Sequence, residues 1–117
     1  MKNSKIMSLS LKFSHKAISL YKELVAEKEY IISKQFLRSA TSIGANVFEA
    51  SAACSRKDFV HKMSIASKEA RESYYWLILL KDSQLIHIHV DGQIEDIRNI
   101  INVLTAIVKT TSKSLGK

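Results

Sequence analysis

The 117-residue chain contains no proline, only three glycines and a single cysteine. A β-rich domain of this length needs many turn residues, so this composition favours long helices joined by short connections. The lone thiol of Cys54 excludes an intrachain disulfide and a cysteine-rich zinc site, and it suits a reducing compartment. No apolar run approaches the roughly 20 residues that span a bilayer, and the first residues make a poor signal peptide. We therefore expect a cytoplasmic protein with a single domain over residues 1–117.

Apolar residues recur every three or four positions in four segments, which is the periodicity of an amphipathic helix. The predicted helices cover about residues 8–28, 32–53, 56–82 and 92–112. Four helices of this length with short loops predict an all-α fold, an antiparallel up-down-up-down four-helix bundle. Three of the segments carry a second apolar stripe, and surplus apolar surface is typical of an interface. We therefore expect a homo-oligomer with Tyr75 and Trp76 at its interface, because aromatic side chains dominate interface energies.

Three local patterns refine these boundaries. Gly44 lies among small residues inside the second segment, which indicates a close helix contact, and a helix break at Gly44 is the alternative. Ser55 and Asp58 match the S/T-x-x-D/E capping pattern at the start of the third helix. Residues 84–90 alternate like a strand, but they have no partner strand. We expect them to form a connecting segment, with Asp91 capping the fourth helix.

The net charge of +7 is unevenly distributed along the chain. Residues 1–22 contain five lysines, residues 97–117 contain three lysines and one arginine, and neither stretch contains an acidic residue. Such a distribution permits binding to a polyanion, and the alternative is a solvated surface that serves solubility. The candidate nucleic-acid-binding residues are Lys12, Lys16, Arg56, Lys57, Lys62, Lys113 and Lys117.

The centre of the chain resembles a known family. The resemblance rests on RSATSIGANVFEA (Arg38 to Ala50) and SRKDFVHKMSIASKEARESYYWLILLKDSQLI (Ser55 to Ile86). Both are similar to the 23S rRNA-intervening sequence proteins, also called S23 ribosomal proteins. Many members have glycine after the motif glutamate where this chain has Ala50, so the second helix is expected to continue further here.

This resemblance implies a four-helix bundle that assembles into an annular homopentamer, and it implies no enzymatic activity. The accessory variability determinant proteins of diversity-generating retroelements look similar in fold. They are basic pentamers that partner a reverse transcriptase and nucleic acid. The partners expected here are therefore further copies of the chain, together with RNA, DNA or a protein partner, and no membrane.

The resemblance also places five residues on the polar positions of the family motif: Arg38, Asn46, Glu49, Glu69 and Glu72. Unpaired buried charges are costly, so we interpret these residues as a structural polar network. Arg38 is expected opposite Glu69 or Glu72, and Asn46 opposite a backbone or serine group of the neighbouring helix. Contact with a ligand is the alternative role.

The spacing of histidines and carboxylates does not predict a metal site. A di-iron bundle needs two Glu-x-x-His motifs, and the nearest pattern here is one Asp58-x-x-His61. His87 and His89 lack a third ligand. We therefore expect neither a metal nor any other cofactor.

One pattern leaves an enzymatic alternative open. Arg56 and His61 have the R-x4-H spacing that resembles the catalytic motif of HEPN-type ribonucleases. A histidine that moves a proton and an arginine that stabilises a phosphorane would suit RNA cleavage without a metal. The same residues also fit a helix cap with a basic first turn. We therefore expect a non-enzymatic protein, with the ribonuclease as the minor alternative and a protein-interaction scaffold as the main one.

Overall fold

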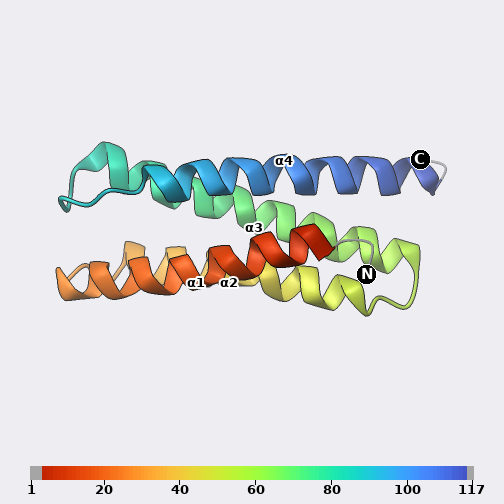
Figure 1. Cartoon of the computed structure of the whole chain (residues 1–117), viewed down its shortest axis with the longest axis horizontal. Coiled ribbons are helices and arrows are strands. Elements are labelled where there is room, and N and C mark those ends of the chain that lie inside the picture. Colours follow the sequence, from red (N-terminus) through yellow and green to blue (C-terminus); the bar gives the residue numbers. More distant parts are fainter. Residues whose placement is uncertain (1–3, 116–117) are drawn as a thin grey trace.

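The computed structural model describes residues 4–115, which form four helices joined by short connections. The helices are α1 (Ser4–Ala26), α2 (Ile32–Ser51), α3 (Arg56–Ser83) and α4 (Asp91–Ser114). Successive helices run in opposite directions, and α1 and α3 each pack against α2 and α4 (Figure 1). The predicted all-α, up-down-up-down bundle is therefore confirmed. Within residues 4–115, no helix combines the length and the apolar character needed to cross a membrane.

The largest departures from the predicted boundaries are at the ends of the first two helices. α1 begins at Ser4 rather than near residue 8, and its apolar stripe starts with Ile6, which is buried in the core. It ends at Ala26, because Lys28 adopts a left-handed backbone conformation (φ 65°) that terminates the helix. α2 ends at Ser51 rather than 53, so it does not continue as far as its sequence indicated.

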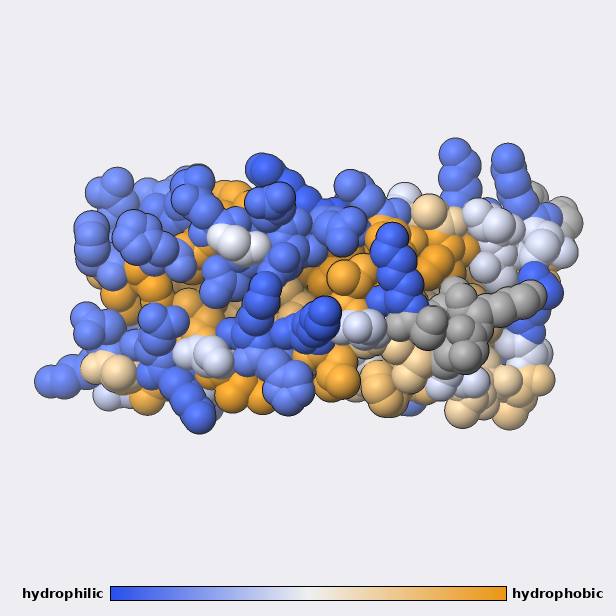
Figure 2. Space-filling view, viewed as in Figure 1, coloured by the Kyte–Doolittle hydropathy of each residue, from blue (hydrophilic) through white to orange (hydrophobic). Residues whose placement is uncertain are grey.

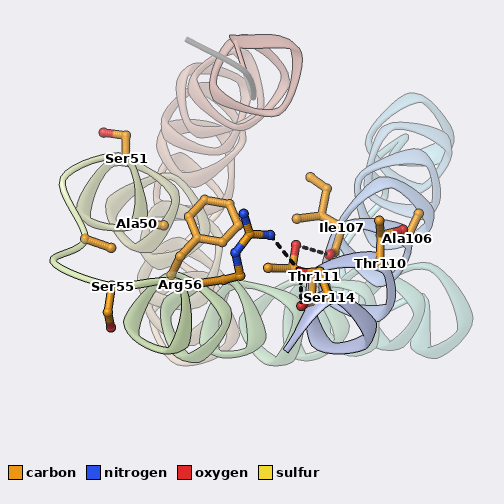
Figure 3. Close-up of a pocket in the computed structure, with 11 residues that line it drawn as sticks. Ala50, Ser51, Ser55, Arg56, Ala106, Ile107, Thr110, Thr111 and Ser114 are labelled. Carbon is orange, nitrogen blue, oxygen red and sulfur yellow. Dashed lines mark hydrogen bonds between the residues drawn. The ribbon is translucent and has the colours of Figure 1, made fainter. Parts of the chain in front are cut away.

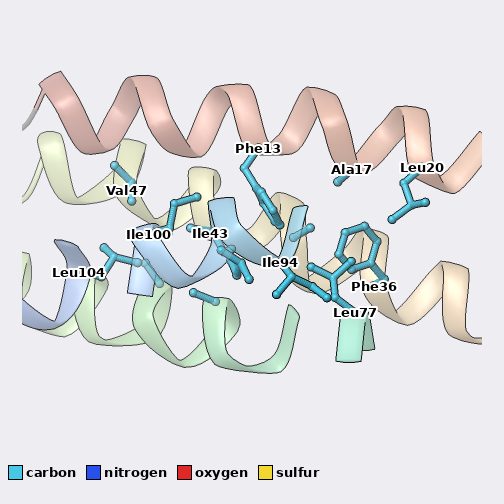
Figure 4. Close-up of a cluster of buried hydrophobic side chains, with 14 of the residues drawn as sticks. Phe13, Ala17, Leu20, Phe36, Ile43, Val47, Leu77, Ile94, Ile100 and Leu104 are labelled. Atoms are coloured by element: carbon cyan, nitrogen blue, oxygen red, sulfur yellow. The ribbon is translucent and has the colours of Figure 1, made fainter. Parts of the chain in front are cut away.

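The core is a continuous column of apolar side chains contributed by all four helices (Figure 4). The rings of Phe13 and Phe36 meet edge to face with centroids 6.2 Å apart and join α1 to α2. Each fully buried large apolar side chain stabilises the fold by about 1.5–3 kcal/mol relative to an exposed one. The hydroxyls of Ser39 and Ser73 lie 2.9 Å apart and form a buried hydrogen bond between α2 and α3.

Helix α2 continues without a break through Gly44, so the predicted close contact is confirmed. Gly44 is buried against α1. A Cβ atom at this position would lie 3.4 Å from the hydroxyl of Ser14 and 3.6 Å from the backbone carbonyl oxygen of Ser10. The small residues of α2 thus allow the two helices to approach closely.

The start of α2 is capped by Glu29, a residue that the sequence analysis did not identify. Its carboxylate accepts backbone N–H bonds from Ile31 (3.1 Å), Ile32 (3.0 Å) and Ser33 (2.6 Å), and Glu29 is buried. Burial alone raises the pKa of a carboxyl group, but the hydrogen bonds from Ser33, Ile32 and Ile31 outweigh it and lower the pKa of Glu29. The ionised form of Glu29 therefore stabilises this helix end.

The predicted cap of α3 is confirmed, whereas that of α4 is wrong. The Ser55 hydroxyl accepts the backbone N–H of Asp58 at 3.0 Å. At the start of α4, Asp91 is the first helical residue, and no side chain caps the helix. The Asp91 carboxylate instead forms an ion pair with Lys81 (2.9 Å), which lowers the pKa of Asp91.

The segment that joins α3 to α4 contains no strand and packs Ile86, Ile88 and Val90 against the bundle, as expected, whereas Leu85 is 60% exposed. Val90 is buried, and Ile86 and Ile88 are half-buried. Gln84 turns the chain out of α3 through a left-handed conformation (φ 52°). This end of the bundle is therefore closed by the connection itself.

Candidate nucleic-acid interface

Four cationic residues gather at the end of the bundle where α3 begins and α4 ends. Arg56 and Lys57 lie in the first turn of α3, and Lys109 and Lys113 lie in the last turns of α4. The start of α3 and the end of α4 lie at the same end of the molecule (Figure 1). We call these four residues the basic end. A helix N-terminus carries a partial positive charge, so the potential of α3 adds to that of Arg56 and Lys57.

The four side chains differ in what they contact. The Arg56 guanidinium donates a hydrogen bond to the hydroxyl of Ser114 (2.7 Å), which joins α3 to α4. Lys57, Lys109 and Lys113 are exposed, and none of them forms an ion pair with a residue of the described part, 4–115. In Figure 2 hydrophilic side chains dominate the left part of the visible surface, whereas the right-hand part is paler and more apolar, with a few hydrophilic side chains projecting from it. Three ammonium groups are thus free to meet an external anion.

Lys109 was absent from the candidate residues predicted from the sequence. A lysine at this place is also explained by the helix dipole, which favours cations near a helix C-terminus. The signal that identifies it is its spacing: Lys109 lies four residues before Lys113, so both project from the same side of α4. The sequence did not show that this end of α4 lies beside the start of α3.

The remaining predicted cations do not join the basic end. Lys16 on α1 forms an ion pair with Asp96 of α4 (2.7 Å). Lys12 and Lys16 both line a small hollow between these two helices. Lys62 forms an ion pair with Glu49 of α2 (2.8 Å), whose hydrogen bond and charge raise the pKa of Lys62. These contacts provide a structural role for Lys16 and Lys62. Lys117 lies outside the described residues.

The predicted polar network consists of separate contacts. Arg38 and Glu72 form the expected ion pair between α2 and α3, with Nη2 and Oε2 2.9 Å apart. Asn46 instead donates its amide N–H to the backbone carbonyl of Ser42 within α2 (2.8 Å). Glu69 has one carboxylate oxygen, Oε1, that is shielded from solvent and has no hydrogen-bond partner in the part of the chain that the structure describes. The register of α2 against α3 therefore depends on several local contacts.

The two predicted interface aromatics have different surroundings. Tyr75 is 58% exposed, whereas Trp76 is half-buried. The Trp76 indole N–H donates to Glu72 Oε2 (3.1 Å), and its ring meets that of Tyr75 edge to face with centroids 5.0 Å apart. Trp76 thus packs within the chain and supports Tyr75, which projects from α3. Their role in an oligomer remains a prediction.

Arg56 and His61 do not meet in a common cleft. Five residues along a helix correspond to a rotation of about 140°, so the two side chains leave α3 in different directions. Arg56 lines a groove between α2, α3 and α4, and His61 is exposed elsewhere on α3. The arrangement that a HEPN-type ribonuclease requires is therefore not provided by these two residues within one chain.

Two further histidines, His87 and His89, lie in the segment before α4, whereas His15 lies on α1. The rings of His87 and His89 are exposed, with centroids 6.0 Å apart. Residues 4–115 contain no group of three or more histidine, cysteine or carboxylate side chains that would hold a metal ion.

Comparisons with known proteins identify relatives of the chain. Residues 2–109 match the family model described as 23S rRNA-intervening sequence protein. A search of curated proteins gives no match. A crystal structure of a protein of unknown function from the S23 ribosomal protein family of Bacteroides thetaiotaomicron VPI-5482 is 44% identical, with a TM-score of 0.85. That comparison covers 89% of this chain and 98% of the other.

Proposed function

The chain belongs to the 23S rRNA-intervening sequence protein family, and we propose that it is a non-enzymatic, oligomeric cytoplasmic protein that binds nucleic acid through its basic end. One observation carries this proposal. Lys57, Lys109 and Lys113 form no ion pair among residues 4–115, and they lie with Arg56 at the positive end of the α3 dipole.

The placement of Arg56 and Lys57 is electrostatically unusual for a purely structural surface, whereas Lys109 and Lys113 lie where the α4 dipole favours cations. Two cations at a helix N-terminus are disfavoured by a few tenths of a kcal/mol each, because they repel the partial positive charge of the helix. Arg56 and Lys57 occupy this position in α3, with Asp58 as the only acidic residue in the first turn. A phosphate group bound here would interact favourably with the Lys57 ammonium group and with the N-terminus of α3.

The chemistry of the basic end favours contact with the phosphate backbone over base recognition. Lysine ammonium groups on flexible stems act as point charges, whereas base reading requires donors and acceptors fixed in a groove. Binding is therefore expected to tolerate many sequences and to weaken strongly with salt, because neutralised phosphates release their counterions.

Oligomerisation would multiply this charge. The exposed Tyr75 and the family resemblance support self-association, and a pentamer would carry five copies of the basic end. Several weak sites on one assembly bind a long polyanion more tightly than each site alone. A protein partner that processes nucleic acid is compatible with the same surface.

The test is a titration of labelled single-stranded RNA, single-stranded DNA and duplex DNA with the purified protein, followed by fluorescence anisotropy. We expect binding at about 50 mM salt that weakens by at least tenfold at about 200 mM salt. Absence of binding to all three probes at the lower salt would overturn the nucleic-acid proposal and leave the protein-interaction scaffold.

A further inference from the structure

A groove of about 740 Å³ lies at the same end of the bundle and is not explained by nucleic-acid binding. Its walls are the end of α2, the first turns of α3 and one side of the last turns of α4 (Figure 3). The lining residues include Arg56 and Phe59 of α3 and Ala106 and Ile107 of α4. None of them belongs to α1.

The groove occupies a corner that α1 fills further along the bundle. α1 packs against both α2 and α4 and completes the four-helix arrangement. Ile6, near the start of α1, is buried in the core, whereas Leu104 is the last residue of α4 that is fully buried. Beyond these residues α4 continues for ten more residues to Ser114, with Ile107 half-buried and Ala106 exposed. Among residues 4–115, one face of α4 therefore has no helical neighbour at this end.

The lining of the groove suits a helix better than a flat surface or a small polar ligand. Phe59 and Ile107 form an apolar floor, and the walls carry alanine, serine and threonine side chains. Packed helices lie 8–10 Å apart, and small residues at the contact allow the shorter of these separations. A helix laid between α2 and α4 would bury the floor and extend the four-helix packing to this end.

The charge around the groove indicates which kind of helix would bind there. Arg56 lines the groove, and Lys57, Lys109 and Lys113 lie at the same end. Cationic side chains at this end attract an acidic helix and repel a basic one. We propose that the groove receives an amphipathic, acidic helix of a partner protein. Its apolar side would pack on Phe59 and Ile107, and a carboxylate would pair with Arg56.

This inference is independent of nucleic-acid binding, although both use the basic end. A polyanion requires the ammonium groups of the lysines and does not require the apolar floor. A docked helix requires the floor to be open. Filling the groove at Ala106 therefore separates the two functions.

The experiment uses the full-length protein, labelled with nitrogen-15, and a synthetic helical peptide with alanine and leucine on one side and glutamate on the other. Two control peptides are a scrambled one of identical composition and one with lysine in place of glutamate. The acidic amphipathic peptide is expected to shift the amide resonances of residues 50–59 and 106–114. The scrambled and lysine peptides are expected to bind at least about tenfold more weakly, because they lose the apolar face or the charge complement.

The matched variants are Ala106→Trp, which fills the groove, and Ala26→Trp, which adds the same side chain at an exposed position at the other end of the bundle. Ala106→Trp is expected to weaken binding of the acidic peptide by at least about tenfold and to leave nucleic-acid affinity within about twofold of wild type. Ala26→Trp should change neither the peptide affinity nor the nucleic-acid affinity. The proposal is overturned if Ala106→Trp leaves peptide binding unchanged, or if the scrambled peptide binds equally well. It is also overturned if Ala106→Trp abolishes self-association, which would assign the groove to a second copy.

Discussion

The guanidinium of Arg38 and the indole of Trp76 converge on one carboxylate oxygen, Oε2 of Glu72, at 2.9 and 3.1 Å. This contact joins α2 to α3 and holds the indole beside the Tyr75 ring. The Arg38 side chain is 57% exposed and that of Glu72 is 33% exposed, so solvent screens the ion pair. The contact therefore orients the aromatic pair more than it stabilises the fold.

Replacement of Arg38 tests that distinction. Arg38→Ala is expected to lower the free energy of unfolding by less than about 1 kcal/mol, because exposed ion pairs contribute little. Glu72→Ala should cost more, since it also leaves the half-buried Trp76 indole N–H without its acceptor. Urea unfolding of both variants measures the difference. A loss above about 3 kcal/mol for Arg38→Ala would indicate a buried network in place of a surface contact.

Gly44 gives a prediction with opposite signs for two substitutions. A Cβ atom at this position finds ordinary contact distances, 3.4 Å or longer, to atoms of Ser10 and Ser14. Gly44→Ala should therefore raise the free energy of unfolding by about 0.5–1 kcal/mol through its better helix propensity. Gly44→Leu should lower it by about 1–3 kcal/mol by forcing α1 away from α2. Thermal and urea unfolding of the two variants test both signs, and destabilisation by alanine would show that the contact is tighter than these distances indicate.

Glu29 makes stability depend on pH. Its pKa in the folded protein is lowered from an ordinary value of 4.5, so its contribution is present above that value. The contribution is lost as the pH falls through the lowered pKa. Glu29→Ala is expected to cost about 1–2 kcal/mol at neutral pH, because three backbone N–H groups at the start of α2 lose their acceptor.

The measurement for Glu29 is urea unfolding at pH values from about 7 to about 3. The difference between wild type and Glu29→Ala should shrink below about pH 4. Glu27→Ala is the control, since Glu27 is exposed and precedes the same connection. A difference for Glu29→Ala that stays constant across this range would show that the cap does not require the ionised carboxylate.

Self-association is predicted to depend on Tyr75. Tyr75→Ala should reduce the mass measured by light scattering after size-exclusion chromatography, because the exposed ring would be buried by a neighbouring copy. Tyr30→Ala is a matched control, since Tyr30 is also 58% exposed but lies in the connection between α1 and α2. An unchanged oligomer with Tyr75→Ala, or a wild-type protein that is monomeric at all concentrations, would remove Tyr75 from the interface.

The sequence predicts the four helices and their order because each segment has the apolar periodicity of a helix, from Phe13 in α1 to Leu104 in α4. It also predicts the Ser55 cap and the Arg38–Glu72 contact, since both follow from local spacing and motif position. The Glu29 cap is missed because glutamate is not among the residues that usually cap a helix start, and Glu29 lies three residues before the first helical residue, Ile32.

The arrangement of the candidate site is harder to predict from the sequence than the helices are. Lys57 and Lys109 are 52 residues apart, and only the antiparallel packing of α3 and α4 brings their ends together. Lys16 and Lys62 are predicted as binding residues because the sequence does not show that Asp96 and Glu49 lie opposite them. The groove depends on how far α1 extends beside α4. No local sequence pattern indicates that extent.

The salt dependence of nucleic-acid affinity, compared between two variants that each lose three lysines, tests the central claim most directly. One variant carries Lys57→Gln, Lys109→Gln and Lys113→Gln at the basic end. The other carries Lys22→Gln, Lys28→Gln and Lys34→Gln at the opposite end, where all three lysines are exposed. The basic-end variant is predicted to lose at least about tenfold in affinity at about 50 mM salt. The magnitude of its slope of log K against log salt should fall by about two to three, while the control variant keeps the wild-type slope. Equal losses in both variants, or no loss in either, would contradict binding at the basic end.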